Sequence, residues 1–138
     1  MDLHILSLRA ALDFKPAKPT YAIQIYSSFS SVRSKLSVES YTHIAQYVFD
    51  DNDERFTAGP VTITTDIADS IVREFAEWKD RVEALLVQCS RGENRSPAVA
   101  MALNELFNLG HDSAKLKGQF NVYNDFVYRA VLLAGQRR

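Results

Sequence analysis

The chain has 138 residues, enough for one domain with a single hydrophobic core, and we expect residues 1–138 to form that one domain. Its formal net charge of −1 argues against a general nucleic-acid binder, and no apolar stretch reaches the length that spans a membrane. A single cysteine rules out an internal disulfide and a thiolate zinc site. Because the N-terminus also lacks the pattern of a signal peptide, we expect a protein of the reducing cytoplasm, and we leave its oligomeric state open.

Apolar and β-branched residues predict three strands in the first half of the chain, at 3–8, 21–26 and 42–49. The proline-containing segment 9–20 and the serine-rich segment 27–40 predict connecting loops between them. A helix is predicted to begin at Thr65 or Asp66, either of which can supply the N-cap. Its apolar residues fall at helical spacing on one face: Ile67, Ile71, Phe75 and Trp78.

The second half of the chain predicts one more strand followed by helices. The short apolar run 84–87 is typical of a buried parallel strand. Helices are predicted at 97–109 with Gly110 as the C-cap, at 111–118, and at 121–134. The alternation of strands and helices predicts an α/β fold with a mainly parallel central sheet of about four strands, flanked by helices. Such sheets bind ligands at the carboxyl ends of their strands.

The only cysteine follows the strand 84–87 closely and opens a short polar loop that leads into the next helix. A thiol near a helix N-terminus meets unpaired backbone N–H groups and the positive end of the helix dipole, and both favour the nucleophilic thiolate. Arg95, six residues after Cys89, can hold two oxygens of a phosphate group over the sulfur. Gly92 permits a sharp turn, and the Ser96 hydroxyl can donate a hydrogen bond to the sulfur.

The spacing Cys89–x5–Arg95–Ser96, with Gly92 between a strand and a helix, resembles the signature loop of cysteine-dependent protein tyrosine phosphatases. The shortness of the chain makes the dual-specificity branch the most similar one. This resemblance implies phosphoester hydrolysis through a phosphocysteine intermediate at Cys89, with Arg95 binding phosphate and Ser96 assisting release of the thiolate. It implies a phosphorylated protein as the substrate, with phosphotyrosine as the class. Phosphoserine, phosphothreonine and small phosphoesters stay open, and no cofactor is expected.

The loop itself is expected to bind the substrate's phosphate, because its backbone N–H groups can converge on the phosphate oxygens. The residues concerned are Ser90, Arg91, Gly92, Glu93, Asn94 and Arg95. Arg91 raises the positive potential at the rim. Glu93 lowers that potential and can brace either Arg91 or Arg95.

The mechanism that the resemblance implies also needs an aspartate that protonates the leaving oxygen and later activates water. Asp50, Asp51 and Asp53 directly follow the predicted strand 42–49, at the expected edge of the sheet. We rank Asp51 first, Asp50 second and Asp53 third. Like-charge repulsion within this cluster is expected to raise the pKa of at least one member.

One residue departs from the family pattern: Gln88 stands immediately before the cysteine, where the family usually has histidine. Glutamine cannot supply positive charge, so we expect a weaker preference for the thiolate and slower turnover. The departure also supports an alternative, a pseudophosphatase whose loop binds phosphate without hydrolysing it. A rhodanese-like sulfurtransferase is a third, lower-ranked hypothesis. The three histidines show no metal-ligand spacing, so no metal is expected.

Overall fold

Four parallel strands form the central sheet of the computed structural model, which describes residues 1–30 and 33–138. They are β1 (Asp2–Ser7), β2 (Thr20–Tyr26), β3 (His43–Val48) and β4 (Ala84–Cys89). In the sheet β4 lies between β1 and β2, and β3 occupies the far edge beside β2. Every residue of β2 and β4 is buried, as expected for inner strands covered on both faces. The predicted fold class is confirmed.

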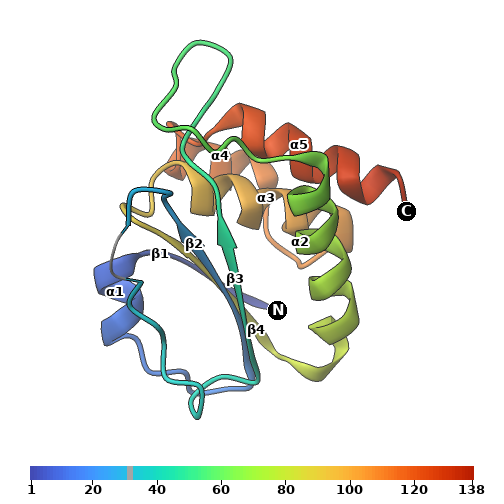
Figure 1. Ribbon diagram of the computed structural model, residues 1–138. Helices are drawn as coiled ribbons and strands as arrows, with labels where there is room; N and C mark the ends of the chain where they lie inside the picture. Colours follow the sequence, from blue (N-terminus) through green and yellow to red (C-terminus); the bar gives the residue numbers. More distant parts are fainter. Residues whose placement is uncertain (31–32) are drawn as a thin grey trace.

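Helices cover both faces of this sheet (Figure 1). They are α1 (Leu8–Asp13), α2 (Thr65–Trp78), α3 (Arg95–Phe107), α4 (Ser113–Gln119) and α5 (Asp125–Gln136), with a short 3₁₀ helix, η1 (Lys79–Arg81), after α2. The larger core joins α2, α3 and α5 to one face of the sheet, and a smaller core with Ala11 of α1 covers the other. None of the helices in the described residues is long and apolar enough to cross a membrane.

Element boundaries differ from the predictions where local capping decides them. The predicted connector 9–20 contains most of α1, whose first turn is capped by the Ser7 hydroxyl accepting from the Ala10 N–H. Helix α2 is capped by Thr64 rather than by Thr65 or Asp66, as shown by the Ile67 N–H, which donates to the Thr64 hydroxyl.

Helix α3 differs at both of its ends. It begins at Arg95, two residues earlier than predicted, and its C-cap is Asn108 in the left-handed conformation, not Gly110. The loop 27–40 shows no helix or strand in its described part, and residues 31–32 of that loop lie outside the described residues.

Because the four strands are parallel, their carboxyl ends all lie at the same edge of the sheet. Ser7 pairs with Cys89, and Tyr26 pairs with Val48, so the segments that follow these residues leave the sheet side by side. Figure 1 shows the segment after β3 projecting beyond this edge before the chain enters α2. We call residues 50–62 the acid loop and residues 89–95 the cysteine loop.

Candidate active site

The Cys89 sulfur lies at the end of β4 with hydrogen-bonding groups gathered around it. The backbone N–H groups of Gly92 and Ser96 donate to Sγ, with N–S distances of 3.3 and 3.4 Å. The thiol is also 3.2 Å from the Ser96 hydroxyl oxygen, and Cys89 is only 2% exposed. When the sulfur is ionised, this hydroxyl can turn and become a third donor. Donors placed in this way stabilise negative charge on a sulfur atom.

The cysteine loop depends on a glycine at its turn. Gly92 has a φ of 72°, in the left-handed region that favours glycine. A Cβ at this position would lie 2.5 Å from the backbone nitrogen of Ser7. The Leu8 N–H donates to the Ser90 carbonyl at 3.3 Å. The junction of β1 and α1 therefore supports the cysteine loop from behind and leaves no room for a side chain at residue 92.

Arg95 is a buried cation at the first position of α3. It is 5% exposed, and its Nη1 donates to the Phe49 carbonyl at 2.8 Å, directly after β3. Its Nη2 lies 3.4 Å from the Ser90 hydroxyl, within the cysteine loop. These contacts hold the guanidinium beside the cysteine loop and connect the ends of β3 and β4.

A pocket of about 210 Å³ opens over the sulfur. The cysteine loop contributes one part of its lining and the segments after β2 and β3 contribute the other. The lining residues are Ser27, Phe29, Asp50, Asp51, Ala58, Cys89, Ser90, Arg91, Asn94 and Arg95. Of the two arginines that Glu93 was expected to brace, it lies 4.0 Å from Arg91, and both of these side chains are exposed. The structure thus brings two of the three candidate aspartates to the cysteine.

Asp50 is buried and fully engaged by hydrogen bonds. Its Oδ1 accepts from the Ser28 N–H at 2.9 Å, and its Oδ2 accepts from the Ser28 hydroxyl at 2.7 Å and the Val61 N–H at 2.9 Å. Burial alone would raise the pKa of this carboxyl. The bonds from Ser28 and Val61, with the charge of Arg95, outweigh burial and hold the pKa below its ordinary value of 3.8. The repulsion expected within the acidic cluster therefore does not dominate at Asp50.

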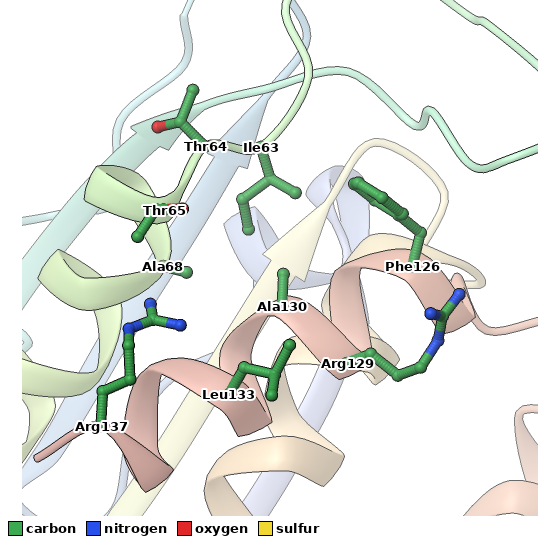
Figure 2. A pocket seen from close by; sticks show the side chains of 9 residues that line it. All are labelled: Ile63, Thr64, Thr65, Ala68, Phe126, Arg129, Ala130, Leu133 and Arg137. Carbon is green, nitrogen blue, oxygen red and sulfur yellow. The ribbon is translucent and has the colours of Figure 1, made fainter.

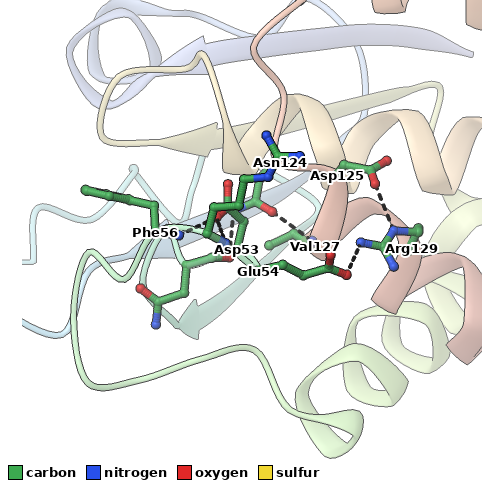
Figure 3. A network of polar contacts seen from close by, with 9 residues as sticks. Asp53, Glu54, Phe56, Asn124, Asp125, Val127 and Arg129 are labelled. Atoms are coloured by element: carbon green, nitrogen blue, oxygen red, sulfur yellow. Dashed lines mark hydrogen bonds and ion pairs between the residues drawn. The ribbon is translucent and has the colours of Figure 1, made fainter.

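Asp51 and Asp53 have different surroundings, although both lie in the acid loop. Asp51 is half-buried, lines the pocket, and accepts one hydrogen bond through Oδ1. Asp53 is exposed, and its Oδ1 accepts from the N–H groups of Arg55 and Phe56, which closes a tight turn (Figure 3). Asp53 is not among the residues that line the pocket over the sulfur.

Asn124 links the acid loop to the cysteine loop, a role that was not predicted from the sequence. Its Nδ2 donates to Asp51 Oδ1 at 2.8 Å and to the Asn52 carbonyl at 2.9 Å. Its Oδ1 caps α5 by accepting from the Val127 N–H, and its own N–H donates to the Asn94 carbonyl at 3.0 Å. The detectable signal was an asparagine followed by an acidic first turn, but a helix predicted from residue 121 placed Asn124 inside it.

A second link between the acid loop and α5 lies on the surface. The Arg129 guanidinium is 2.7 Å from Glu54 and 2.8 Å from Asp125, and Figure 3 shows it between the two carboxylates. All three side chains are largely exposed, so each ion pair contributes little to stability.

Gln88 lies in a glutamine ladder (Gln24, Gln46 and Gln88) across three neighbouring strands. Gln24 Nε2 donates to Gln88 Oε1 at 2.9 Å, and Gln46 Nε2 donates to Gln24 Oε1 at 3.2 Å. Gln24 also donates to the Ser34 carbonyl at 3.1 Å. Because neighbouring residues of a strand point to opposite faces, Gln88 points away from the face of Cys89. Its amide therefore connects strands and does not contact the sulfur.

Another hollow, of about 190 Å³, lies between the start of α2 and α5 (Figure 2). Both arginines at its edge are paired, Arg129 as described and Arg137 with Asp69 at 2.7 Å. In the described part of the chain, no three histidine, cysteine or acidic side chains gather as a set of metal ligands. In the pocket over Cys89, a thiol, a buried cation and carboxylates meet.

The fold has counterparts among solved structures. Models of protein families and curated protein sequences give no match. The structure of Tk-PTP in its active form is similar, with a TM-score of 0.56 and 12% identity, over 100% of this chain and 93% of that one. OH1 from the Orf virus, described as a tyrosine phosphatase with triple substrate specificity, gives a TM-score of 0.49 and 18% identity, over 97% and 79% of the two chains. The similarity to Tk-PTP shows that this chain has the fold of the protein tyrosine phosphatase superfamily.

Proposed function

We propose that this protein is a cysteine-dependent phosphatase that hydrolyses phosphate monoesters through a phosphocysteine at Cys89. The observation that carries the proposal is the pocket itself. A sulfur held by the Gly92 and Ser96 N–H groups lies in it beside the buried cation of Arg95 and the carboxylate of Asp51. The proposed enzyme is a single-domain protein that resembles the dual-specificity branch and acts in the cytoplasm. Its proposed substrate is a phosphorylated protein or a small phosphoester.

In the first step the Cys89 thiolate attacks phosphorus, an S–P bond forms and the ester P–O bond breaks. The N–H groups of the cysteine loop and the Arg95 guanidinium bind the phosphoryl oxygens and stabilise the charge that develops on them. Asp51, protonated at this stage, gives its proton to the leaving oxygen. The alcohol or phenol then departs, and Asp51 is left as a carboxylate.

In the second step water attacks the phosphocysteine. The Asp51 carboxylate takes a proton from the water, the new P–O bond forms, and the S–P bond breaks. The Ser96 hydroxyl, 3.2 Å from the sulfur, stabilises the departing thiolate. Inorganic phosphate leaves, and Asp51 is protonated again for the next cycle.

Asp51 is preferred to the other acids on the basis of their surroundings. Asp50 is held ionised by three hydrogen bonds and its lowered pKa, so it is poorly suited to give up a proton near neutral pH. Asp53 closes a turn outside the pocket. Asp51 lines the pocket, and among the described residues Asn124 alone donates a hydrogen bond to its carboxylate.

Hydrolysis of phenyl phosphate by the wild type and by Cys89→Ser tests the proposal. We expect the substitution to lower kcat by about 10⁴-fold or more, because the nucleophile of the first step is lost. Unchanged melting temperature and circular dichroism would show that the variant is folded. Hydrolysis that persists in Cys89→Ser would refute the mechanism.

The phosphate-binding pseudophosphatase is the second candidate, and Gln88 is the observation that favours it. The same experiment separates the two functions. A wild type that binds inorganic phosphate at Cys89 but does not hydrolyse phenyl phosphate would support binding without catalysis.

A further inference from the structure

Arg129 joins the tip of the acid loop to helix α5. Its Nη2 lies 2.7 Å from Glu54 Oε1 and its Nε lies 2.8 Å from Asp125 Oδ2, so different nitrogens of one guanidinium bind two carboxylates (Figure 3). Asp125 is the first residue of α5 and lies one helical turn before Arg129. The pair within the helix orients the guanidinium in advance, which lowers the conformational entropy that is lost when it binds Glu54.

The tip of the acid loop, residues 53–58, is a compact turn. The Asp53 N–H donates to the Phe56 carbonyl at 2.9 Å, and Asp53 Oδ1 accepts from the Phe56 N–H at 2.7 Å. Within the described part of the chain, the Arg129–Glu54 pair is the only hydrogen bond or ion pair that joins residues 53–58 to a segment outside the acid loop. That pair therefore attaches the turn to the body of the protein.

The attachment lies close to the proposed acid, Asp51. Asn124, the N-cap of α5, already holds the loop through bonds of 2.8 Å to Asp51 and 2.9 Å to the Asn52 carbonyl. Arg129 holds it again at Glu54, three residues after Asp51. One attachment leaves a segment free to pivot, whereas two fix its direction. Loss of Arg129 is therefore expected to loosen the position of the Asp51 carboxylate without removing any group from the pocket.

The exposure of this link sets the size of its effect and makes it sensitive to salt. The side chains of Arg129 and Glu54 are 49% and 66% exposed. An exposed ion pair shifts an equilibrium between two positions of a loop by about two- to fivefold. Salt screens such charges, because the Debye length falls from about 10 Å at 0.1 M to about 3 Å at 1 M ionic strength.

We propose that Arg129 is a positioning residue that holds the acid loop so that Asp51 reaches the leaving oxygen, and that it makes proton donation depend on ionic strength. This inference rests on the proposed role of Asp51 as the general acid. Arg129 is not among the residues that line the pocket over Cys89. It therefore contributes to one chemical step and not to phosphate binding.

Arg137 provides a matched control for Arg129. It follows the last residue of α5, its side chain is 45% exposed, and it pairs with Asp69 of α2 at 2.7 Å. Both arginines lie at the edge of the same hollow (Figure 2). Arg137→Met removes the same charge and the same kind of ion pair as Arg129→Met, but it leaves the acid loop untouched.

The test compares kcat and KM for phenyl phosphate and 4-nitrophenyl phosphate. We expect Arg129→Met to lower kcat for phenyl phosphate by about two- to fivefold, with KM within about twofold, and to lower kcat for 4-nitrophenyl phosphate less, because that leaving group needs less protonation. Arg137→Met should match the wild type for both esters, and the melting temperatures should show that both variants are folded. In NaCl raised from about 0.1 M to about 1 M, kcat of the wild type should approach that of Arg129→Met.

Exchanging the two charges separates positioning from a general effect on α5. Glu54→Arg and Arg129→Glu should each lower kcat for phenyl phosphate, because each places like charges opposite one another. The double variant Glu54→Arg/Arg129→Glu restores an opposite-charge pair between the acid loop and α5. We expect it to recover most of the kcat that either single variant loses.

The outcomes that would overturn the inference are distinct from those that overturn the proposed function. Equal kcat values for Arg129→Met and Arg137→Met, with Asp51→Asn still slow, would refute the role of Arg129 alone. Equal losses for the two esters, or no recovery in the double variant, would refute it as well, because the effect would not act through proton donation. Wild-type hydrolysis of phenyl phosphate by Asp51→Asn, or no hydrolysis by the wild type, would refute the proposed acid or the proposed function, and with it the inference.

Discussion

The cysteine loop and the acid loop meet in one pocket but are held in different ways. In the cysteine loop, the backbone donors to the sulfur come from the same short segment: the Gly92 and Ser96 N–H groups bond to Cys89, while Ser7 supports the Gly92 turn from β1. In the acid loop, each of the two carboxylates that line the pocket is bonded by a residue distant in sequence, Asp50 by Ser28 and Asp51 by Asn124. Contacts within a short segment can be recognised as a motif in the sequence, whereas contacts from distant residues cannot.

Two neighbouring carboxylates of the acid loop, Asp50 and Asp51, have different surroundings and different proposed roles. Asp50 is buried and ionised, and it ties the segment after β2 to the acid loop. Asp51 lines the pocket and is oriented by Asn124. Four substitutions test the different roles of Asp50 and Asp51 and the different contacts of the two loops. They follow in order from the largest expected effect to the smallest.

Replacing the proposed acid should have the largest effect outside the cysteine loop. We expect Asp51→Asn to lower kcat for phenyl phosphate by about 10²- to 10⁴-fold, because the leaving oxygen loses its proton donor. The loss should be smaller for 4-nitrophenyl phosphate, whose leaving group needs less protonation. Asp53→Asn is the matched control and should stay near the wild-type rate. A smaller loss in Asp51→Asn than in Asp53→Asn would contradict the assignment.

Asp50→Asn should act on stability. We expect the free energy of unfolding at pH 7 to fall by about 2–3 kcal/mol, since hydrogen bonds to a buried charged group are lost. The folded pKa of Asp50 lies below its ordinary value of 3.8, so its contribution is complete above that pH and is lost as pH falls through the folded pKa. Urea unfolding at pH 7 and at pH 3 would measure the difference. Equal stabilities of wild type and variant at pH 7 would contradict the structural role.

Asn124→Ser tests a positioning residue. Serine can still cap α5, but it cannot reach Asp51 as the asparagine amide does, so we expect kcat for phenyl phosphate to fall by about tenfold. A purely structural role would lower stability without changing the dependence on the leaving group. We expect the loss to be larger for phenyl than for 4-nitrophenyl phosphate, and to vanish in an Asp51→Asn background. An equal tenfold loss in that background would show that Asn124 acts by another route.

Gln88→Leu should have the smallest catalytic effect. The change removes one of the two acceptors of the buried Gln24 amide, so we expect a loss of about 1–2 kcal/mol in the free energy of unfolding, with kcat/KM within about twofold of the wild type. Gln88→His is the companion variant. A sharp rise in its activity would favour the expectation from sequence, that Gln88 weakens the thiolate, over the connecting role of the glutamine ladder.

The sequence predicted those parts of the molecule that local rules decide. The buried run 84–87, the loop from Cys89 to Arg95 and the helix after it carry strong local signals, and the predicted α/β class follows from their alternation with the other elements. Helix α1 was missed because six residues give too short a period to recognise. Its cap, Ser7, gave the only local signal.

The roles of single polar residues depended on tertiary contacts and could not be predicted. Nothing local distinguishes Asp50 from Asp51, because the difference comes from Ser28 on one side and Asn124 on the other. Phe29 stands in a serine-rich segment with no periodic signal, and only the fold brings it to the sulfur. Sequence patterns therefore predicted the place of Cys89 between strand and helix better than the surroundings of the aspartates and of Phe29.

The central claim is that the Cys89 sulfur takes the phosphoryl group, and trapping that intermediate tests it most directly. Asp51→Asn, mixed with a ³²P-labelled aryl phosphate and denatured within one turnover, should retain label on the peptide that contains Cys89. The double variant Cys89→Ser/Asp51→Asn should retain none. Label on another residue, or equal labelling of the two variants, would contradict the account.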